Sequence, residues 1–176
     1  MILPGATLGV LGGGQLGRMF THAARDMGYR VWTLDPDPHS PTGQSADRHL
    51  QADYLDRQAL QQLADNCAAI TTEFENVPAE TLAFLEQRLP VRPSAAAVAI
   101  ARNRIAEKTF IRDLGLPTAA FFPINESDEI KAACERLSMP ALLKTAQFGY
   151  DGKGQVTVNN APDALQGFES LKRVPC

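Results

Sequence analysis

The sequence has 176 residues and a formal net charge of -3, with 44% of its residues hydrophobic and 21% charged. This composition is typical of an ordinary globular protein, and the length supports one large domain or one domain with part of a second. The small negative charge and the lack of a long basic run give no reason to expect nucleic acid or an anionic membrane as a partner. No apolar stretch approaches the roughly 20 residues of a membrane span, so no membrane segment is expected either.

The cysteines and histidines show no pattern typical of a metal site or a disulfide framework. The three cysteines are widely spaced and include no CxxC pair, which indicates the reduced thiols of a cytoplasmic protein. The three histidines have no spacing that would join them around a metal ion, so structural roles are expected for His22, His39 and His49.

The chain opens with a strand, a glycine-rich turn and a helix. The apolar run 7–11 predicts a buried strand, residues 12–17 form the turn, and apolar residues then recur at helical spacing as far as Met27, with Gly28 as the helix stop. A helix N-terminus gathers free N–H groups and carries roughly half a positive charge, so we predict that this turn binds a phosphate. The alternative is a turn that needs glycine only to pack strand against helix.

The same turn also fits the fingerprint of dinucleotide-binding proteins. Gly12, Gly14 and Gly17 have the required spacing, and Asp35 closes the next predicted strand, 30–34. In a dehydrogenase Asp35 would accept hydrogen bonds from a ribose. It could equally open the proline-rich loop that follows, and the sequence leaves both interpretations open.

Strands and helices alternate through the rest of the first half. The predicted helices cover 56–66, 79–88, 95–100 and 103–114, and the predicted strands cover 68–72 and the surroundings of 89–92. About four strand–helix units in a row predict half of a doubly wound α/β domain.

The segment 73–78 places two carboxylates and an amide where a parallel strand ends. In open α/β sheets, ligands bind beyond the carboxyl ends of the strands, so we predict a ligand role for at least one of Glu73 and Glu75. The alternative makes Glu75 and Asn76 capping groups of the helix 79–88. A capping role for Asn76 is compatible with a ligand role for a glutamate.

The pattern changes after Pro117. It predicts strands at 121–124, 141–146 and 156–158 and a helix at 127–137. A second glycine-rich stretch, 149–155, forms the tip of a hairpin that carries Lys153, and Lys144 lies near the end of the neighbouring strand. This combination suits a polyphosphate better than a plain turn does, and it is not a Walker A loop because it lacks GKS or GKT and no helix follows it directly.

A basic face accompanies the helix 103–114. Arg102, Arg104, Lys108 and Arg112 recur at or near four-residue spacing. Such a run is usually a solvated helix face, and we expect this for Arg102 and Arg112.

Taken together, these motifs resemble the ATP-grasp superfamily, and within it the family of 5-(carboxyamino)imidazole ribonucleotide synthases. The matching stretches are 12–19, 34–37, 72–78, Arg104, Lys108, 116–118, 144–145 and 149–155. The resemblance implies an α/β fold: a Rossmann-like pre-ATP-grasp domain with a parallel sheet over residues 1–98. A linker helix and an incomplete α+β ATP-grasp lid would follow over residues 99–176.

The resemblance also implies an activity. In this family ATP phosphorylates bicarbonate to carboxyphosphate, and the amine of 5-aminoimidazole ribonucleotide captures the carboxyl group, which releases ADP and phosphate in de novo purine synthesis. The implied ATP-binding residues are Arg104, Lys144, Gly149, Tyr150, Asp151, Gly152, Lys153, Gly154 and Gln155. The implied substrate-binding residues are Gly14, Gln15 and Leu16 for the 5′-phosphate and Glu73, Glu75 and Asn76 for the ribose or imidazole.

The family further implies Mg2+, a homodimer and a cytoplasmic location. Its metal ligands belong to a C-terminal ATP-grasp domain, so none is expected in this chain, and the chain is expected to be an incomplete, inactive fragment. Two positions depart from the family: Ala146 and Phe148 stand where an arginine and a further glycine are usual.

Three other functions remain open. One is a different ATP-grasp ligase, such as a formate-dependent glycinamide ribonucleotide transformylase, although the run 73–76 favours the imidazole enzyme. Another is a nicotinamide-dependent oxidoreductase, which has no use for Lys144 and the second glycine-rich stretch. The last is a nucleotide-binding module without catalytic activity.

Overall fold

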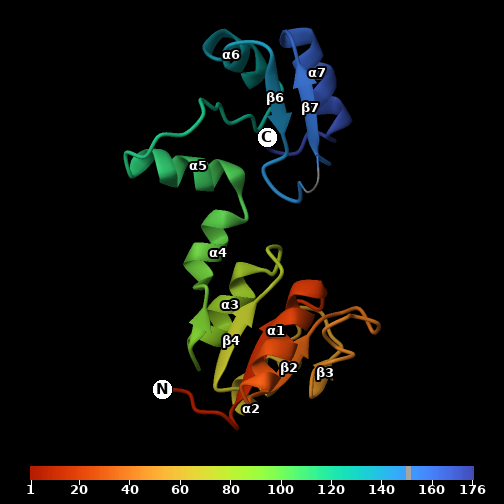
Figure 1. Ribbon diagram of the computed structural model, residues 1–176. Coiled ribbons are helices and arrows are strands. Elements are labelled where there is room, and N and C mark those ends of the chain that lie inside the picture. The colour runs from red at the N-terminus through yellow and green to blue at the C-terminus, as the bar shows by residue number, and fades with distance from the viewer. Residues whose placement is uncertain (150–151) are drawn as a thin grey trace. The chain divides into compact units, whose positions relative to one another are not determined.

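Figure 1 shows the computed structural model of the chain, which describes residues 1–149 and 152–176. The chain divides into two compact units, Met1–Ala99 and Ile100–Cys176. None of the helices in these described ranges combines the length and the apolar character needed to cross a lipid bilayer.

The first unit is built on a parallel sheet with the strand order β3-β2-β1-β4-β5. Its strands are β1 (Thr7–Leu11), β2 (Arg30–Leu34), β3 (Arg48–Leu50), β4 (Ala69–Thr72) and β5 (Val91–Arg92). Leu11 is in register with Leu34 on one side and with Thr72 on the other, so the residues that follow β1, β2 and β4 emerge together at one edge of the sheet. In a doubly wound sheet this edge, beside the first strand, is where ligands bind.

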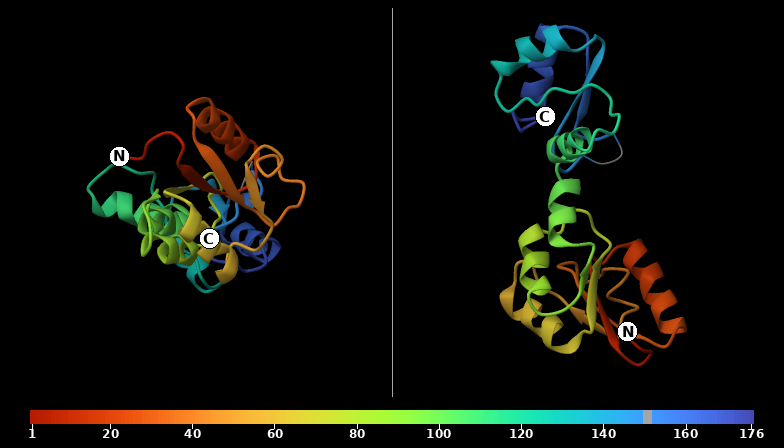
Figure 2. Two further views of the ribbon diagram at one scale, coloured as in Figure 1. Left: turned by 90° about the horizontal axis from the view of Figure 1, so that it is seen from below. Right: turned by 90° about the vertical axis from the view of Figure 1, so that its left-hand side faces the viewer.

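Helices cover both faces of this sheet, as the right-hand view of Figure 2 shows. The helices are α1 (Gln15–Asp26), α2 (Arg57–Asn66), α3 (Ala79–Glu86) and α4 (Ala95–Ala101). Successive residues of a strand point to opposite faces, and Val10 accordingly packs with Ala24 of α1, whereas Leu11 belongs to the core that Leu60 of α2 and Leu82 of α3 share. The predicted α/β class with a parallel sheet is confirmed. β3 was not predicted, because three residues are too few to show a strand pattern.

The helix α1 is confirmed, but its apolar spacing does not mark the buried face. Leu16 and Met19 are 59% and 67% exposed, and the buried residues are Gly17, Thr21 and Ala24. These residues are small because α1 lies very close to its neighbours: a Cβ atom on Gly17 would stand 2.5 Å from the Oγ1 atom of Thr42. The helix ends as predicted, with Gly28 at a φ of 83°.

The second unit packs two helices against a hairpin. Its elements are α5 (Arg104–Asp113), α6 (Glu129–Arg136), β6 (Ala141–Lys144), β7 (Gln155–Val158) and α7 (Ala161–Ser170). β6 and β7 are antiparallel, and Leu143 and Val158 pack with Phe168 of α7. The helix α7 was not predicted, although Asn160, whose side chain accepts from the N–H of Asp163, provides a recognisable cap.

The predicted strand at 121–124 is wrong, because these residues have no regular secondary structure. Pro123 has no N–H to donate, which disfavours a strand at this point. Of the four residues, only Ile124 forms strand-like backbone hydrogen bonds. It exchanges two of them with Cys176, with N···O distances of 2.9 and 2.8 Å.

Candidate functional site

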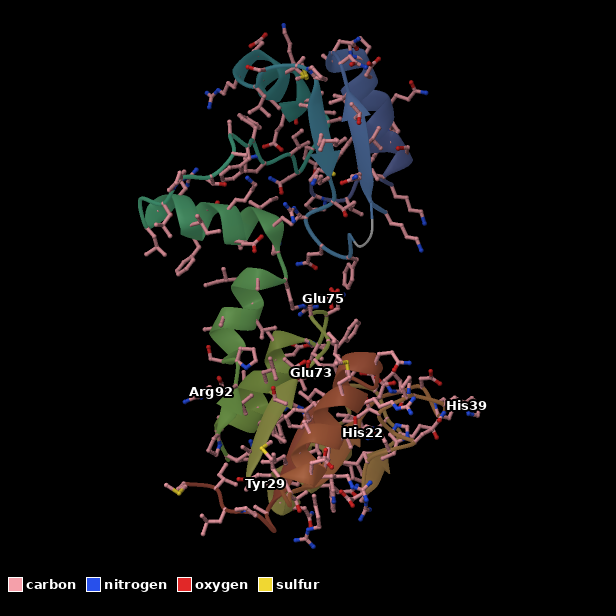
Figure 3. All side chains as sticks on the ribbon, viewed as in Figure 1. His22, Tyr29, His39, Glu73, Glu75 and Arg92 are labelled. Atoms are coloured by element: carbon pink, nitrogen blue, oxygen red, sulfur yellow. The ribbon has the colours of Figure 1, made fainter. Side chains whose placement is uncertain are left out.

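The glycine-rich turn and the segment 73–78 meet at the carboxyl edge of the first unit's sheet. Glu73 N donates to Leu11 O at 3.0 Å, and Gly12 N donates to Leu34 O at 3.2 Å. A Cβ atom on Gly12 would stand 2.8 Å from the Cβ atom of Phe74, so the two loops are in contact. Figure 3 shows Glu73 and Glu75 just beyond the end of β4.

The glycines of the turn are required by the fold at three positions and not at the fourth. Gly12 has a φ of 108°, and a Cβ atom on Gly13 or Gly17 would stand 2.4 Å from Ser40 or 2.5 Å from Thr42. Gly14 has a φ of −73°, and a Cβ atom there would meet nothing within 4 Å. Neither backbone strain nor packing within the described residues therefore explains a glycine at position 14.

Three exposed N–H groups at this turn have no acceptor within residues 1–149 and 152–176, namely those of Gly14, Gln15 and Leu16. The first helical bond of α1 runs from Arg18 N to Gly14 O at 3.1 Å, and no side chain caps the helix. A helix N-terminus with several free donors favours an anion.

The carboxylate of Asp35 accepts hydrogen bonds from groups of its own domain, so it is not free to accept them from a ribose. Its Oδ2 atom accepts hydrogen bonds from Gly13 N and from the Tyr54 hydroxyl, both at 2.6 Å, and its Oδ1 atom accepts from Asp37 N at 2.9 Å. Of the two interpretations of Asp35, the structure supports a loop-organising residue.

Tyr54 was missed by sequence reasoning, because it lies outside every motif. Burial raises the pKa of its hydroxyl, and the hydrogen bond to Asp35 and the charges of Asp35 and Asp53 raise it further. Tyr54 therefore remains a donor at neutral pH. Its ring also contacts Phe74, with 5.9 Å between the ring centroids.

The two polar residues that follow Phe74 do not cap α3. The N-cap position is Pro78 and no side chain bonds to the free helix donors, so the capping alternative is wrong for both Glu75 and Asn76. Instead Asn76 Nδ2 donates to Glu75 Oε1 at 3.3 Å. Glu73 is half-buried, and its carboxylate has no hydrogen-bond partner in the described part of the chain.

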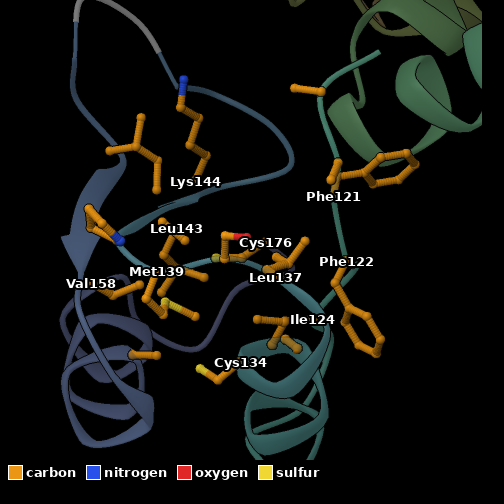
Figure 4. Close-up of a pocket in the computed structure, with 18 of the residues that line it drawn as sticks. Phe121, Phe122, Ile124, Cys134, Leu137, Met139, Leu143, Lys144, Val158 and Cys176 are labelled. Atoms are coloured by element: carbon orange, nitrogen blue, oxygen red, sulfur yellow. The ribbon is translucent and has the colours of Figure 1, made fainter. Parts of the chain in front are cut away.

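The second unit contains a pocket of about 530 Å3 with apolar walls and three cationic residues, Arg104, Lys108 and Lys144. Figure 4 shows the Lys144 side chain extending away from Met139, Cys134 and Ile124. Lys108 is committed to the fold, since its Nζ atom donates to Thr118 Oγ1 at 2.9 Å and to Ala119 O at 3.0 Å. The side chains of Arg104 and Lys144 make no hydrogen bond or ion pair within the described residues.

The second glycine-rich stretch is anchored at its base. Of its predicted ATP-binding residues, Tyr150 and Asp151 lie outside the described residues. Thr145 N donates to Gly154 O at 2.9 Å, and a Cβ atom on Gly154 would stand 2.6 Å from Thr145 Oγ1. Gly152 and Gly154 have φ values of 77° and 73°, a conformation that favours glycine.

The remaining members of that stretch and its flanks are also placed. Gly149 lies against Thr145, Lys153 is exposed, and Gln155 is in register with Lys144. At the two positions that depart from the family, Ala146 is buried and Phe148 is 70% exposed at a φ of 59°.

The two arginines expected to be solvated, Arg102 and Arg112, differ in their surroundings. Arg112 is exposed and pairs with the neighbouring Asp113 at 3.1 Å, as expected of a solvated residue. Arg102 differs, because its Nε atom is buried and has no partner among the described residues.

No group of three or more His, Cys, Asp or Glu side chains in the described ranges is arranged to hold a metal ion. Figure 3 places His22 on α1 and His39 in the loop that follows β2. His49 Nε2 lies 3.0 Å from Asp35 O, which is a structural contact.

The comparison with protein families decides the relationship of this chain. Residues 5–102 match the ribonucleotide synthetase preATP-grasp domain. The chain belongs to this family. Residues 109–176 match the ATP-grasp domain, which agrees with the predicted resemblance.

Relatives of this preATP-grasp chain cover it almost completely. The N5-carboxyaminoimidazole ribonucleotide synthase of Pseudomonas aeruginosa is 45% identical over 96% of the chain and 47% of its own length. A crystal structure of the Staphylococcus aureus N5-carboxyaminoimidazole synthetase complexed with ADP is 39% identical, with a TM-score of 0.94 over 99% of this chain and 47% of that one.

A third relative was solved with both ADP and 5-aminoimidazole ribonucleotide. It is the Aspergillus clavatus N5-carboxyaminoimidazole synthase, 30% identical, with a TM-score of 0.79 over 96% of this chain and 44% of that one. The chain spans about half the length of the curated relatives it matches.

Proposed function

We propose that this chain provides the ribonucleotide-binding domain and part of the ATP-binding lid of an enzyme that carboxylates 5-aminoimidazole ribonucleotide. ATP would activate bicarbonate as carboxyphosphate, and the amine of the ribonucleotide would take up the carboxyl group, with release of ADP and phosphate. The names of relatives at 38–45% identity support this reaction. The reaction belongs to purine synthesis, for which we propose the cytoplasm. We also propose a homodimer, on the basis of the family resemblance.

The single observation that carries the proposal is the open space at Gly14. The three other glycines of the turn are fixed by strain or packing, whereas a Cβ atom at position 14 would meet nothing within 4 Å and residues 14–16 are exposed. A glycine there lets a phosphate approach the backbone, so that Gly14, Gln15 and Leu16 can donate to its oxygens. Glu73, Glu75 and Asn76, at the same edge, are proposed to bind the ribose or imidazole.

The ATP phosphates are assigned to the second unit. Arg104 and Lys144 offer cationic groups that make no hydrogen bond or ion pair within residues 1–149 and 152–176, on the wall of a pocket that is otherwise largely apolar. Gly149, Gly152, Lys153, Gly154 and Gln155 belong to the same proposed site, together with Tyr150 and Asp151 from outside the described residues. Phosphoryl transfer requires mainly positioning and charge neutralisation, which these groups supply. No group of three or more His, Cys, Asp or Glu side chains in the described residues is arranged to hold a metal ion, and no step is assigned to Mg2+.

The oxidoreductase alternative loses its main support in the structure. A dinucleotide site of the common type needs a carboxylate free to accept from a ribose. Asp35 already accepts three hydrogen bonds, two of them at 2.6 Å. A different ATP-grasp ligase would bind another amine in place of 5-aminoimidazole ribonucleotide, so the two functions are distinguished by which amine the chain binds.

Calorimetric titration of the chain with 5-aminoimidazole ribonucleotide, ATP with magnesium, glycinamide ribonucleotide and NAD tests the proposal. We expect binding of the imidazole ribonucleotide and of ATP, and none of NAD. Gly14→Asp should abolish binding of the ribonucleotide while the affinity for ATP stays the same, because it places a negative charge at the phosphate position.

Gln87→Asp is the matched control for charge. Gln87 is exposed at the end of α3, beyond the opposite edge of the sheet from the turn. Tight binding of NAD, or of glycinamide ribonucleotide in preference to the imidazole compound, would contradict the proposal.

A further inference from the structure

One carboxylate oxygen connects the glycine-rich turn to a residue far along the chain. Asp35 Oδ2 accepts from Gly13 N and from the Tyr54 hydroxyl, each at 2.6 Å. Gly13 is buried, and Asp35 and Tyr54 are half-buried. Bonds of this length to a carboxylate are charge-assisted and stronger than bonds between neutral groups.

The peptide held in this way is the one directly before the exposed donors. Gly13 O accepts from Thr42 N at 2.9 Å, and Gly14 O accepts from the Thr42 hydroxyl at 2.8 Å. The N–H of Gly13 and both of these carbonyls are therefore fixed. The directions of the Gly14 and Gln15 N–H groups follow from these two carbonyls, since a peptide group is planar, and the Leu16 N–H follows them in the first turn of α1.

Tyr54 is itself held firmly. Its backbone O accepts from Thr81 Oγ1 at 2.7 Å, and its ring contacts Phe74 of the neighbouring loop. Without the Tyr54 hydroxyl, Asp35 Oδ2 would keep a single donor, and its negative charge would be less compensated close to the proposed phosphate position. Both effects would weaken an anion site at the turn.

We propose that Tyr54 is a positioning residue for the phosphate-binding turn: its hydroxyl holds the Asp35 carboxylate, which in turn fixes the peptide N–H of Gly13 and aims the three exposed donors. This inference rests on the proposed ribonucleotide function of the turn. Tyr54 touches no phosphate itself and acts through Asp35.

The test compares Tyr54→Phe with Tyr29→Phe in the 176-residue chain. Tyr29 is a matched control because it is also half-buried and donates one hydrogen bond, to Ile2 O at 3.0 Å. It precedes β2, at the opposite end of the sheet from Glu73 and Glu75 (Figure 3). Tyr54→Phe should weaken binding of 5-aminoimidazole ribonucleotide roughly tenfold, as expected for the loss of one hydrogen bond to a charged group. Tyr29→Phe should leave it unchanged.

Two further measurements separate positioning from a general structural effect. Binding of the dephosphorylated nucleoside should be equally weak in the parent and in Tyr54→Phe, because the turn acts on the phosphate alone. In 15N–1H spectra, Tyr54→Phe should shift the Gly13 amide resonance, and Tyr29→Phe should not. Asp35→Asn, which replaces a shared acceptor by an amide, should weaken binding of the ribonucleotide more than Tyr54→Phe does.

The outcomes distinguish this inference from the proposed function. A parent chain that does not bind the ribonucleotide overturns the proposed function, and the inference with it. A parent that binds, together with a Tyr54→Phe variant that binds equally well, overturns the inference alone. An equal loss for ribonucleotide and nucleoside also overturns it, since the effect would then not pass through the phosphate.

Discussion

The two glycine-rich segments of this chain use glycine for different physical reasons. In the turn at 12–17, Gly13 and Gly17 are close-packed against Ser40 and Thr42, and only Gly14 faces open space. In the stretch at 149–155, Gly152 and Gly154 are needed for their positive φ, and Gly154 also closes on Thr145. Packing, together with the positive φ of Gly12, thus fixes the first segment around one open position, whereas backbone conformation and an anchored base define the second.

This difference has a consequence for binding. A turn whose peptides are already hydrogen-bonded, as those of Gly13 and Gly14 are, presents its donors without further ordering, which reduces the entropy cost of binding. Lys144 is in register with Gln155 of the stretch at 149–155, and Arg104 lines the same pocket as Lys144; neither side chain makes a hydrogen bond or ion pair in the described part of the chain. The first segment therefore suits one phosphate of fixed position, and the second suits a charge-rich polyphosphate.

The largest expected effect distinguishes Gly13 from Gly14. Gly13→Ala places a Cβ atom 2.4 Å from Ser40 Cβ and 2.6 Å from Asp35 Cγ, and should lower the free energy of unfolding by about 3 kcal/mol. Gly14→Ala should change it by less than about 0.5 kcal/mol, because its site is open and its φ is ordinary. Urea unfolding followed by the fluorescence of Trp32, the single tryptophan, reports on this unit. Equal costs at the two positions would remove the distinction.

Lys144 tests the assignment of ATP to the second segment. Lys144→Met should weaken binding of ATP by about 2 kcal/mol, the size of a charge-assisted hydrogen bond, and should leave binding of 5-aminoimidazole ribonucleotide unchanged. Lys131→Met, at an exposed position of α6, is the control for loss of charge. Titration calorimetry, with circular dichroism as a check on folding, measures both affinities. If Lys144→Met binds ATP as well as the parent does, Lys144 has only a structural role.

A smaller effect is expected where the second segment closes on β6. Gly154→Ala combines a left-handed backbone with a contact at 2.6 Å to Thr145 Oγ1, and should destabilise the second unit by about 1 to 2 kcal/mol. In a Thr145→Ala background the same substitution should cost less, because the colliding atom is gone. The difference between the two costs is the coupling energy of a double-mutant cycle. Additive costs would show that conformation alone requires the glycine.

The local motifs made much of the first unit predictable. The turn at 12–17 and the acidic segment that opens at Glu73 are each a short continuous motif that directly follows a strand. Because the two strands are parallel, both motifs lie at the same edge of the sheet. The contacts that fix the turn were not predictable in the same way. Tyr54 and Thr42 reach it from loops far along the chain, and no periodic pattern marks either residue.

Two other failures have clear physical reasons. The buried face of α1 consists of small residues such as Gly17 and Ala24, because the helix packs closely, so a search for large apolar side chains selects the exposed Met19 instead. The run 121–124 has strand-like composition, but Pro123 removes a donor and only Ile124 finds a partner.

The most direct measurement of the central claim is a 15N–1H titration of the chain with 5-aminoimidazole ribonucleotide. If the turn binds the 5′-phosphate through its free donors, the amide resonances of Gly14, Gln15 and Leu16 should move together and saturate. The Gly13 amide, already bonded to Asp35, should move less. The dephosphorylated nucleoside should leave all four in place. Saturable binding of the ribonucleotide without movement of the amides of Gly14, Gln15 and Leu16 would contradict the account.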